Sequence, residues 1–287
     1  GTLAQSLNWN PVLLYEWVKN NIETEWYWGC MKGAEETLRQ RRGNDCDQAA
    51  LLVALLRASG YPARYVRGVI EFYPDIERAK NLTGIDDPSK IPEYFQKAGI
   101  PHKTIVAGGR VSNIQIEHIW VETQVPYANY RGAILDEHGK SWLGLDTSIK
   151  VKGYQYNSPI DILQEISLSN LRDEYLSAIQ DLTPLEYVRE SIEAYLQTRN
   201  PPLTTYDELL RKRTLIPEVM NILPASMQYR QVKVTHEYTE VPEELRHRVR
   251  FISTRNPQAA AGDEILNITL DDLKVSNQRI AISYEPE

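Results

Sequence analysis

The hydrophobic positions between residues 10 and 72 follow the helical period first and the strand period afterwards. Asn10 and Pro11 are typical of a helix start, and the amphipathic pattern after them runs to about residue 21. Residues 49–58 are apolar nearly all round and end before Gly60, so they predict a helix that is buried on most sides. From residue 62 to 72 the alternation is typical of a strand. The pattern indicates an α+β fold.

Two later segments are rich in β-branched and aromatic residues, which predicts strands. The strand at residues 116–125 would carry His118 on the same face as Trp120, and the strand at residues 141–146 ends at Asp146. Residues 74–109 are an insertion of helical and turn signals that closes with a glycine pair typical of a hairpin. This insertion is either a flap beside a substrate cleft or a surface embellishment.

Beyond residue 155 the pattern changes twice. Capping boxes predict helix starts at residues 158–161, 183–186 and 205–208. Alternation then returns at residues 231–234, 247–252 and 279–284, which indicates a small β-rich element. We therefore divide the chain into a core of residues 1–155 with its insertion at about 74–109, a helical extension of residues 156–215 and a β-rich element of residues 216–287.

Composition excludes some classes of partner but does not identify a substrate. The chain has 287 residues, of which 42% are hydrophobic, so it can bury a full core and has room for two domains. A formal net charge of -7 argues against nucleic acid or anionic membrane surfaces as main partners. Because no apolar run reaches transmembrane length, we expect no membrane insertion. The sequence ends on a predicted strand, so we expect a longer native polypeptide.

Cys46 is the main chemical candidate, because it follows the polar segment Gly43–Asp45 and begins the buried helix. Unpaired backbone N–H groups and the helix dipole at such a position favour thiolate over thiol. Cys46 is therefore a candidate nucleophile, and its alternative role is that of a small buried hydrophobe. Cys30 is the other cysteine. We expect two free thiols rather than a disulfide that would cap the nucleophile.

His118 and Asp146 can complete a catalytic triad with Cys46 if the two later strands pair. In such a triad the imidazole keeps the sulfur ionised and protonates the leaving amine, while the carboxylate orients the imidazole. Taken alone, His118 has the alternative role of a core histidine, and Asp146 that of a turn or cap residue. This chemistry needs no metal and no cofactor. His236 and His247 lack a second cluster of ligands, so we interpret them as surface or structural residues.

Three sequence blocks resemble the transglutaminase-like superfamily of papain-fold thiol enzymes. The family pattern LLRAxGxPARYVxG matches residues 55–68, LLRASGYPARYVRG. Its histidine block HxWVE matches residues 118–122, and its aspartate block WxxLDPT is matched by WLGLDTS at residues 142–148. The resemblance covers roughly residues 10–155. Two departures are Gly43, which stands three residues before Cys46 instead of two, and Thr147 in place of proline.

The resemblance implies a papain-like core with a central helix packed on an antiparallel sheet, and a Cys46, His118 and Asp146 triad. Residues 27–48 most closely resemble bacterial transglutaminase-like domains embedded in large surface proteins, some of which carry YD-type repeats. That subgroup favours a secreted or cell-envelope location, and a cytoplasmic one stays open. The substrate would be a protein or peptide. Some family members have lost the nucleophile, whereas this chain retains all three residues.

Acyl transfer also needs donors for an oxyanion, and the backbone N–H of Cys46 is one of them. Candidates for the second donor are Trp28, Gln40 and Asn44, although for Trp28 the role of a core or cleft-wall aromatic is the favoured interpretation. Three functions stay open. Hydrolysis of amide bonds is our first expectation, because transamidation demands a water-excluding acceptor site that no sequence feature identifies. The third is a catalytically silent binding module.

Overall fold

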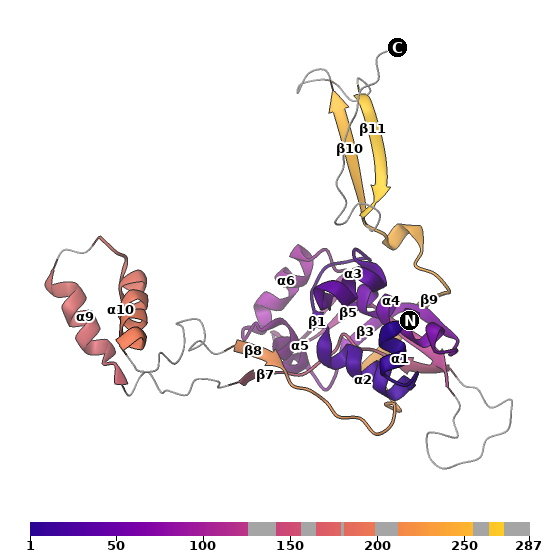
Figure 1. The fold of residues 1–287 in the computed structure, drawn as a ribbon, viewed down its shortest axis with the longest axis horizontal. Coiled ribbons are helices and arrows are strands. Elements are labelled where there is room, and N and C mark those ends of the chain that lie inside the picture. Colours follow the sequence, from indigo (N-terminus) through magenta and orange to yellow (C-terminus); the bar gives the residue numbers. More distant parts are fainter. Residues whose placement is uncertain (126–141, 156–164, 179–180, 199–211, 255–263, 273–287) are drawn as a thin grey trace. The chain divides into compact units, whose positions relative to one another are not determined.

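The computed structural model describes residues 1–125, 142–155, 165–178, 181–198, 212–254 and 264–272. The chain divides into two units (Figure 1). The first, the core unit, combines Gly1–Val151 with Ile216–Glu287, and the second, the helical unit, is Lys152–Leu215. The segment after residue 215 thus returns to the unit formed by the first half of the chain, whereas the sequence pattern set it apart.

The helices of the core unit begin and end where short-range signals place them. The Asn10 side chain accepts a hydrogen bond from Val12 N–H at 2.9 Å, and Asn44 accepts one from Asp47 N–H at the same distance. Gly84 ends its helix in the left-handed conformation with φ +80°. The helices are α1 (Thr2–Ser6), α2 (Pro11–Asn21), α3 (Gly33–Gln40), α4 (Asp45–Ala58), α5 (Ile76–Thr83), the 3₁₀ turn η1 (Pro88–Lys90) and α6 (Ile91–Lys97).

A five-stranded antiparallel sheet forms the centre of the core unit. Its order is β4-β5-β3-β9, and β6 also pairs with β5. Residue Gly68 of β3 lies opposite His118 of β5, and Val121 of β5 lies opposite Leu145 of β6. The strand that carries His118 and the strand that precedes Asp146 are therefore paired, which is the condition that the triad requires. The strands are β3 (Ala63–Phe72), β4 (His102–Ala107), β5 (Arg110–Gln124), β6 (Trp142–Leu145) and β9 (Tyr229–Tyr238).

Strand β9 connects the C-terminal part of the chain to this sheet. It pairs with β3, with Tyr229 opposite Phe72 and Tyr238 opposite Tyr65. The alternating pattern predicted a strand here but could not name its partner, because pairing depends on distant backbone groups. β3 thereby has hydrogen-bonding neighbours on both sides.

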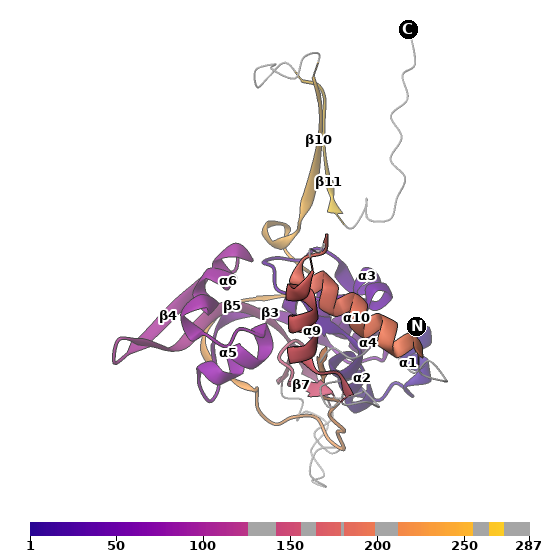
Figure 2. The same cartoon turned by 90° about the vertical axis from the view of Figure 1, so that its left-hand side faces the viewer.

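Helices cover both faces of the sheet. Figures 1 and 2 show α5 and α6 on one side of β3 and β5, and α1, α2 and α4 on the other. Leu52 and Leu56 of α4 are fully buried in the first hydrophobic cluster, together with Leu14 of α2. Phe95 of α6 is fully buried in the second. The insertion at about 74–109 is therefore a packed layer of the core, and its Gly108–Gly109 turn closes the β4–β5 hairpin as predicted.

Smaller elements complete the described chain. The Thr183 backbone and hydroxyl both donate to Glu186, so the predicted capping box starts α10. The predicted helix starts at residues 158–161 and 205–208 and the strand at 279–284 lie outside the described residues. No helix in the described part of the chain is long and apolar enough to cross a membrane. These elements are β1 (Glu23–Thr24), β2 (Arg42–Gly43), β7 (Lys152–Gln155), α9 (Leu168–Ser177), α10 (Pro184–Thr198), β8 (Lys212–Leu215), η2 (Glu243–Leu245), β10 (Arg248–Thr254) and β11 (Glu264–Asp271).

We expect Gly68→Ala to destabilise the core unit. A Cβ atom at this position would lie 2.3 Å from the Lys233 carbonyl oxygen and 2.7 Å from the Trp120 ring. Because the first obstacle is backbone, β9 would have to shift, at a cost of about 1–3 kcal/mol in the free energy of unfolding. Denaturant unfolding followed by circular dichroism measures this loss.

Gly144→Ala is the matched control, since it is also a strand glycine. Its new Cβ would lie 3.3 Å from the flexible Met227 side chain, so we expect a change below about 1 kcal/mol. Equal unfolding free energies for the two variants would contradict the tight approach of β9 to Gly68.

Candidate active site

His118 and Asp146 meet at the point where β5 and β6 pair. His118 Nε2 lies 2.7 Å from Asp146 Oδ2, and the two side chains are almost completely buried. The antiparallel register places Val121 opposite Leu145, so Asp146, the residue after β6, comes level with Trp120, which lies on the same face of β5 as His118. An imidazole and a carboxylate that are predicted from separate segments are thus brought into direct contact.

The turn after β6 is held in place by several buried hydrogen bonds. Ser148 donates to Asp146 Oδ1 from both its backbone N–H and its hydroxyl, each at 2.7 Å. The Tyr15 hydroxyl donates to the Asp146 carbonyl at 2.8 Å, and Thr24 donates to the Ser148 carbonyl at 2.7 Å. Lys150 Nζ donates to the Ile22 carbonyl just past α2. These bonds fix Asp146 with its second oxygen facing His118.

The other imidazole nitrogen faces a second carboxylate. His118 Nδ1 lies 3.0 Å from Asp45 Oδ2, and the same oxygen accepts a hydrogen bond from Ile119 N–H at 2.8 Å. Asp45 is the first residue of α4 and immediately precedes Cys46. Asp45 belongs to none of the sequence motifs that predicted the triad. The available signal was an acidic residue in the first turn of the helix, next to the candidate nucleophile.

Two carboxylates keep the buried imidazole charged. Burial lowers the pKa of His118, but the negative charges of Asp146 and Asp45 outweigh it and raise the pKa to about 10. Burial also raises the pKa of Asp146, yet the His118 charge and the hydrogen bonds from His118 and Ser148 hold this pKa below its ordinary value. At neutral pH the site therefore holds an imidazolium between two carboxylates.

Cys46 is joined to Cys30 by a disulfide, so the expectation of two free thiols is wrong. Their Cα atoms lie 5.3 Å apart, and both residues are buried. Counting cysteines could not reveal this pairing, because the proximity depends on how the loop at residues 27–33 lies against the start of α4. In this state the sulfur of Cys46 is not available as a nucleophile.

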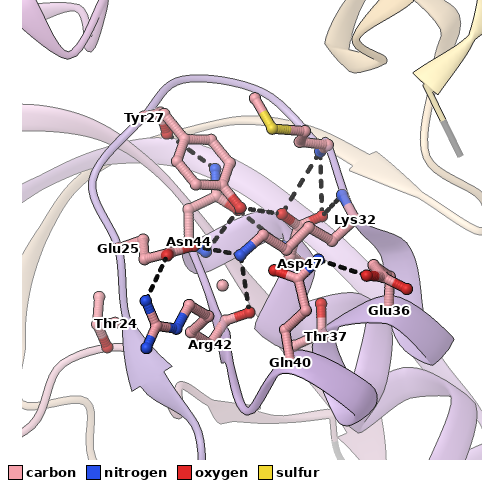
Figure 3. A network of polar contacts seen from close by, with 12 residues as sticks. Thr24, Glu25, Tyr27, Lys32, Glu36, Thr37, Gln40, Arg42, Asn44 and Asp47 are labelled. Atoms are coloured by element: carbon pink, nitrogen blue, oxygen red, sulfur yellow. Dashed lines mark hydrogen bonds and ion pairs between the residues drawn. The ribbon is translucent and has the colours of Figure 1, made fainter. Parts of the chain in front are cut away.

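The clamp that places Cys30 beside Cys46 consists of Asn44 and Asp47 (Figure 3). Asn44 Nδ2 donates to the carbonyls of Tyr27 and Gly29 at 2.8 and 2.5 Å. Asp47 accepts from the Lys32 and Gly33 backbone N–H groups, both at 2.9 Å, and from Met31 N–H at 3.1 Å. Burial raises the pKa of Asp47, and these donors oppose the rise. Two side chains of one helix turn thereby anchor the whole loop at residues 27–33.

A segment from the C-terminal part of the chain runs alongside this loop. Cys30 N–H donates to the Leu245 carbonyl at 2.6 Å, and His247 N–H donates to the Cys30 carbonyl at 3.1 Å. His247 Nε2 also contacts the Trp28 carbonyl at 2.6 Å. We call residues 242–247 the strap. The structural role expected for His247 is thus attachment of the strap to the cysteine loop, while the ring of His236 stacks on Tyr238.

The candidate oxyanion donors differ in whether they already have hydrogen-bond partners. Trp28 Nε1 donates to Glu117 Oε1 at 2.7 Å, and Gln40 on α3 donates to Glu36. The amide of Asn44 is occupied by the clamp described above. The Cys46 backbone N–H lies in the first turn of α4, where N–H groups have no acceptor within the helix. The side chains of Trp28, Gln40 and Asn44 are thus engaged elsewhere, and the Cys46 N–H remains a candidate donor.

A cavity opens on this site. Its walls include Trp28, Asn44, Asp45, Glu117, His118 and Ser148. It therefore reaches the imidazole, the carboxylate Asp45 beside it, and the loop that carries Cys30. No group of three or more histidine, cysteine or acidic side chains in the described residues could hold a metal ion.

We expect His118 to be doubly protonated at pH 7. Its charge stabilises the fold fully below about pH 6.5, and this contribution disappears as the pH rises through 10. Long-range ¹H–¹⁵N correlation spectra of the oxidised protein would show two protonated ring nitrogens for this residue, with titration only near pH 10. A neutral His118 ring at pH 7 would contradict the double carboxylate contact.

Comparison with known proteins agrees with the sequence motifs. No curated protein and no solved structure matches this chain. A family model does match, over residues 10–147, which hold α2, α4, the strands β3 to β6, and all of Cys46, His118 and Asp146. The antiparallel sheet packed against helices is consistent with that family's core. Residues 10–147 are a domain of the transglutaminase-like superfamily.

Proposed function

We propose that this chain is a cysteine-dependent amide-bond hydrolase that acts once the disulfide of Cys46 is reduced. The observation that carries the proposal is the His118 imidazole, which is bonded to Asp146 and to the residue before Cys46. This arrangement puts a charged imidazole at the N-terminus of α4, where a thiolate is favoured. The match of residues 10–147 to a superfamily that includes thiol enzymes supports it.

The chemistry follows from the roles of the three groups. The Cys46 thiolate attacks the amide carbonyl, and the C–N bond breaks as the leaving amine takes a proton from the His118 imidazolium. The product is a thioester between the acyl group and Cys46. Water then attacks the thioester while neutral His118 accepts its proton, and the carboxylic acid and the thiolate are released. Asp146 keeps the imidazole oriented throughout and does not itself transfer a proton.

Reduction is a separate step that precedes turnover. A thiol reductant supplies two electrons: its thiolate attacks one sulfur of the disulfide, and a second thiol group resolves the mixed disulfide. Cys46 is the better leaving sulfur, because the N-terminus of α4 stabilises its thiolate. The attack is therefore expected at Cys30.

The disulfide favours a second candidate function, a binding module without chemistry. If Cys46 remains bonded to Cys30 in its natural setting, the cavity beside His118 is available only for binding. Disulfides persist in oxidising compartments. This supports the proposal of a secreted or cell-envelope location, in keeping with the bacterial surface-protein subgroup that residues 27–48 resemble.

We expect amide cleavage only by the reduced protein. A peptide library would be incubated with wild type, Cys30→Ser and Cys46→Ala, with and without dithiothreitol, and the products would be read by mass spectrometry. Wild type should cleave only with dithiothreitol, and Cys30→Ser in both conditions. Cys46→Ala should be at least about 10³-fold slower.

The same screen separates the three functions. Incorporation of an added primary amine into glutamine residues would establish transamidation in place of hydrolysis. Cleavage that survives in Cys46→Ala would remove the thiol mechanism. No product from reduced wild type or Cys30→Ser, together with saturable peptide binding, would establish the silent module.

We expect Asp146→Asn to lower kcat of the reduced protein by about 10³-fold or more. The asparagine side chain cannot stabilise the imidazolium or maintain the correct tautomer of His118. Peptide hydrolysis measures the loss, and circular dichroism confirms that the variant is folded. Asp173→Asn on the exposed surface of α9 is the control and should leave kcat unchanged. Unchanged turnover in Asp146→Asn would exclude the carboxylate from the mechanism.

A further inference from the structure

Tyr229 reaches the candidate site from a segment that lies outside residues 10–147. It is the first residue of β9, pairs with Phe72 of β3, and is 5% exposed. Its position is determined by the ladder between β3 and β9, because Tyr229 begins the strand that covers this edge of β3. The site of the family domain therefore receives a buried aromatic side chain from the C-terminal part of the chain.

The Tyr229 ring packs against the imidazole of His118. Their ring centroids lie 5.6 Å apart at an interplanar angle of 80°, which is edge-to-face geometry. Tyr229 also contacts Trp120, two residues along β5, at 6.2 Å and 64°. Strand alternation puts His118 and Trp120 on the same face of β5, so one tyrosine ring packs against both.

The contact between Tyr229 and His118 matters most after the imidazole has donated its proton to the leaving amine. In the resting state Asp45 and Asp146 hold the two ring nitrogens. When Nδ1 gives up its proton, its hydrogen bond to Asp45 is lost, and the contacts of Nε2 remain, to Asp146 at 2.7 Å and to the Ser148 hydroxyl at 3.3 Å. A ring held at one nitrogen can tilt about that nitrogen, and the Tyr229 ring packed against the imidazole opposes this motion.

The electrostatics of Tyr229 suit the same role. Burial raises the pKa of its hydroxyl well above the ordinary value, and the negative charge of Asp146 raises it further. The side chain therefore stays neutral and adds no third negative charge beside Asp45 and Asp146. Because the Tyr229 ring keeps the imidazole between its two carboxylates, it also favours the charged form of His118.

We infer that Tyr229 is a positioning residue that holds the His118 imidazole in its reactive orientation through ring contact. This inference rests on the thiol hydrolase proposed above. Under it, the functional site extends beyond the family domain and includes the first residue of β9.

The test compares three substitutions. Tyr229→Phe keeps the ring and should retain kcat within about threefold, whereas Tyr229→Leu should lower kcat about tenfold with KM changed less than about twofold. Tyr238→Leu, at the other end of β9, removes a tyrosine that packs on His236 and should leave kcat unchanged. A Phe variant as slow as the Leu variant would overturn the role of the ring.

A second readout does not depend on activity. In the oxidised wild type, ring protons of His118 and Tyr229 should show a nuclear Overhauser effect, and Tyr229→Leu should lower the pKa of His118, whereas Tyr229→Phe should not. Absence of the Overhauser effect, or an unchanged His118 titration in folded Tyr229→Leu, would overturn the inference. If no variant or wild type hydrolyses peptides, the hydrolase proposal fails, and the spectra still decide the contact.

Discussion

The charged imidazole of His118 needs two carboxylates, and much of the core unit is arranged to supply them. Asp146 arrives through the pairing of β6 with β5, and Asp45 through the first turn of α4. Neither alone would offset the burial of a cation as well as both do, since an isolated buried charge is very costly. The attraction of both carboxylates to the imidazolium therefore stabilises the packing of β6 and α4 near the same point of β5.

Three residues at the N-terminus of α4 have separate roles in the site. The backbone N–H groups and dipole of the helix favour a thiolate at Cys46, Asp45 at its first position binds His118, and Asp47 anchors the loop at residues 27–33. Because Asp47 holds this loop against the helix start, Cys30 lies beside Cys46. A helix start that is well suited to activate a thiol is thus also well suited to form a disulfide, because both depend on a sulfur at this one position.

The sequence was sufficient for the parts of the site that follow from periodicity and chain order. His118 lies in a strongly predicted strand, Asp146 ends another, and their contact required only that the strands pair. Asp45 and Tyr229 could not be predicted in this way. Their roles depend on side-chain direction at a helix start and on the strand that β9 pairs with, and neither has a local signature.

The position of the loop that carries Cys30 could not be predicted from the sequence either. Cys30 and Cys46 are separated by 16 residues, and nothing in that spacing states that the loop folds back. The proximity is the product of hydrogen bonds between residues 27–33 and the side chains of Asn44 and Asp47, to which the loop contributes mostly backbone groups together with the Tyr27 hydroxyl. Backbone partners carry no sequence signal, so only the polar residues at the helix start could have been noticed.

The disulfide is one of several links that hold the loop of Cys30 against α4. Breaking the bond between Cys30 and Cys46 leaves the hydrogen bonds from Asn44 and Asp47 intact, and it leaves the strap bonded to the Cys30 backbone. Reduction therefore frees the sulfur without freeing the loop. The strap holds the same loop through two backbone hydrogen bonds and the His247 imidazole. Because none of these bonds involves a sulfur atom, the loop at residues 27–33 stays attached to α4 and to the strap after reduction, and Cys46 gains its thiol without a rearrangement of the site.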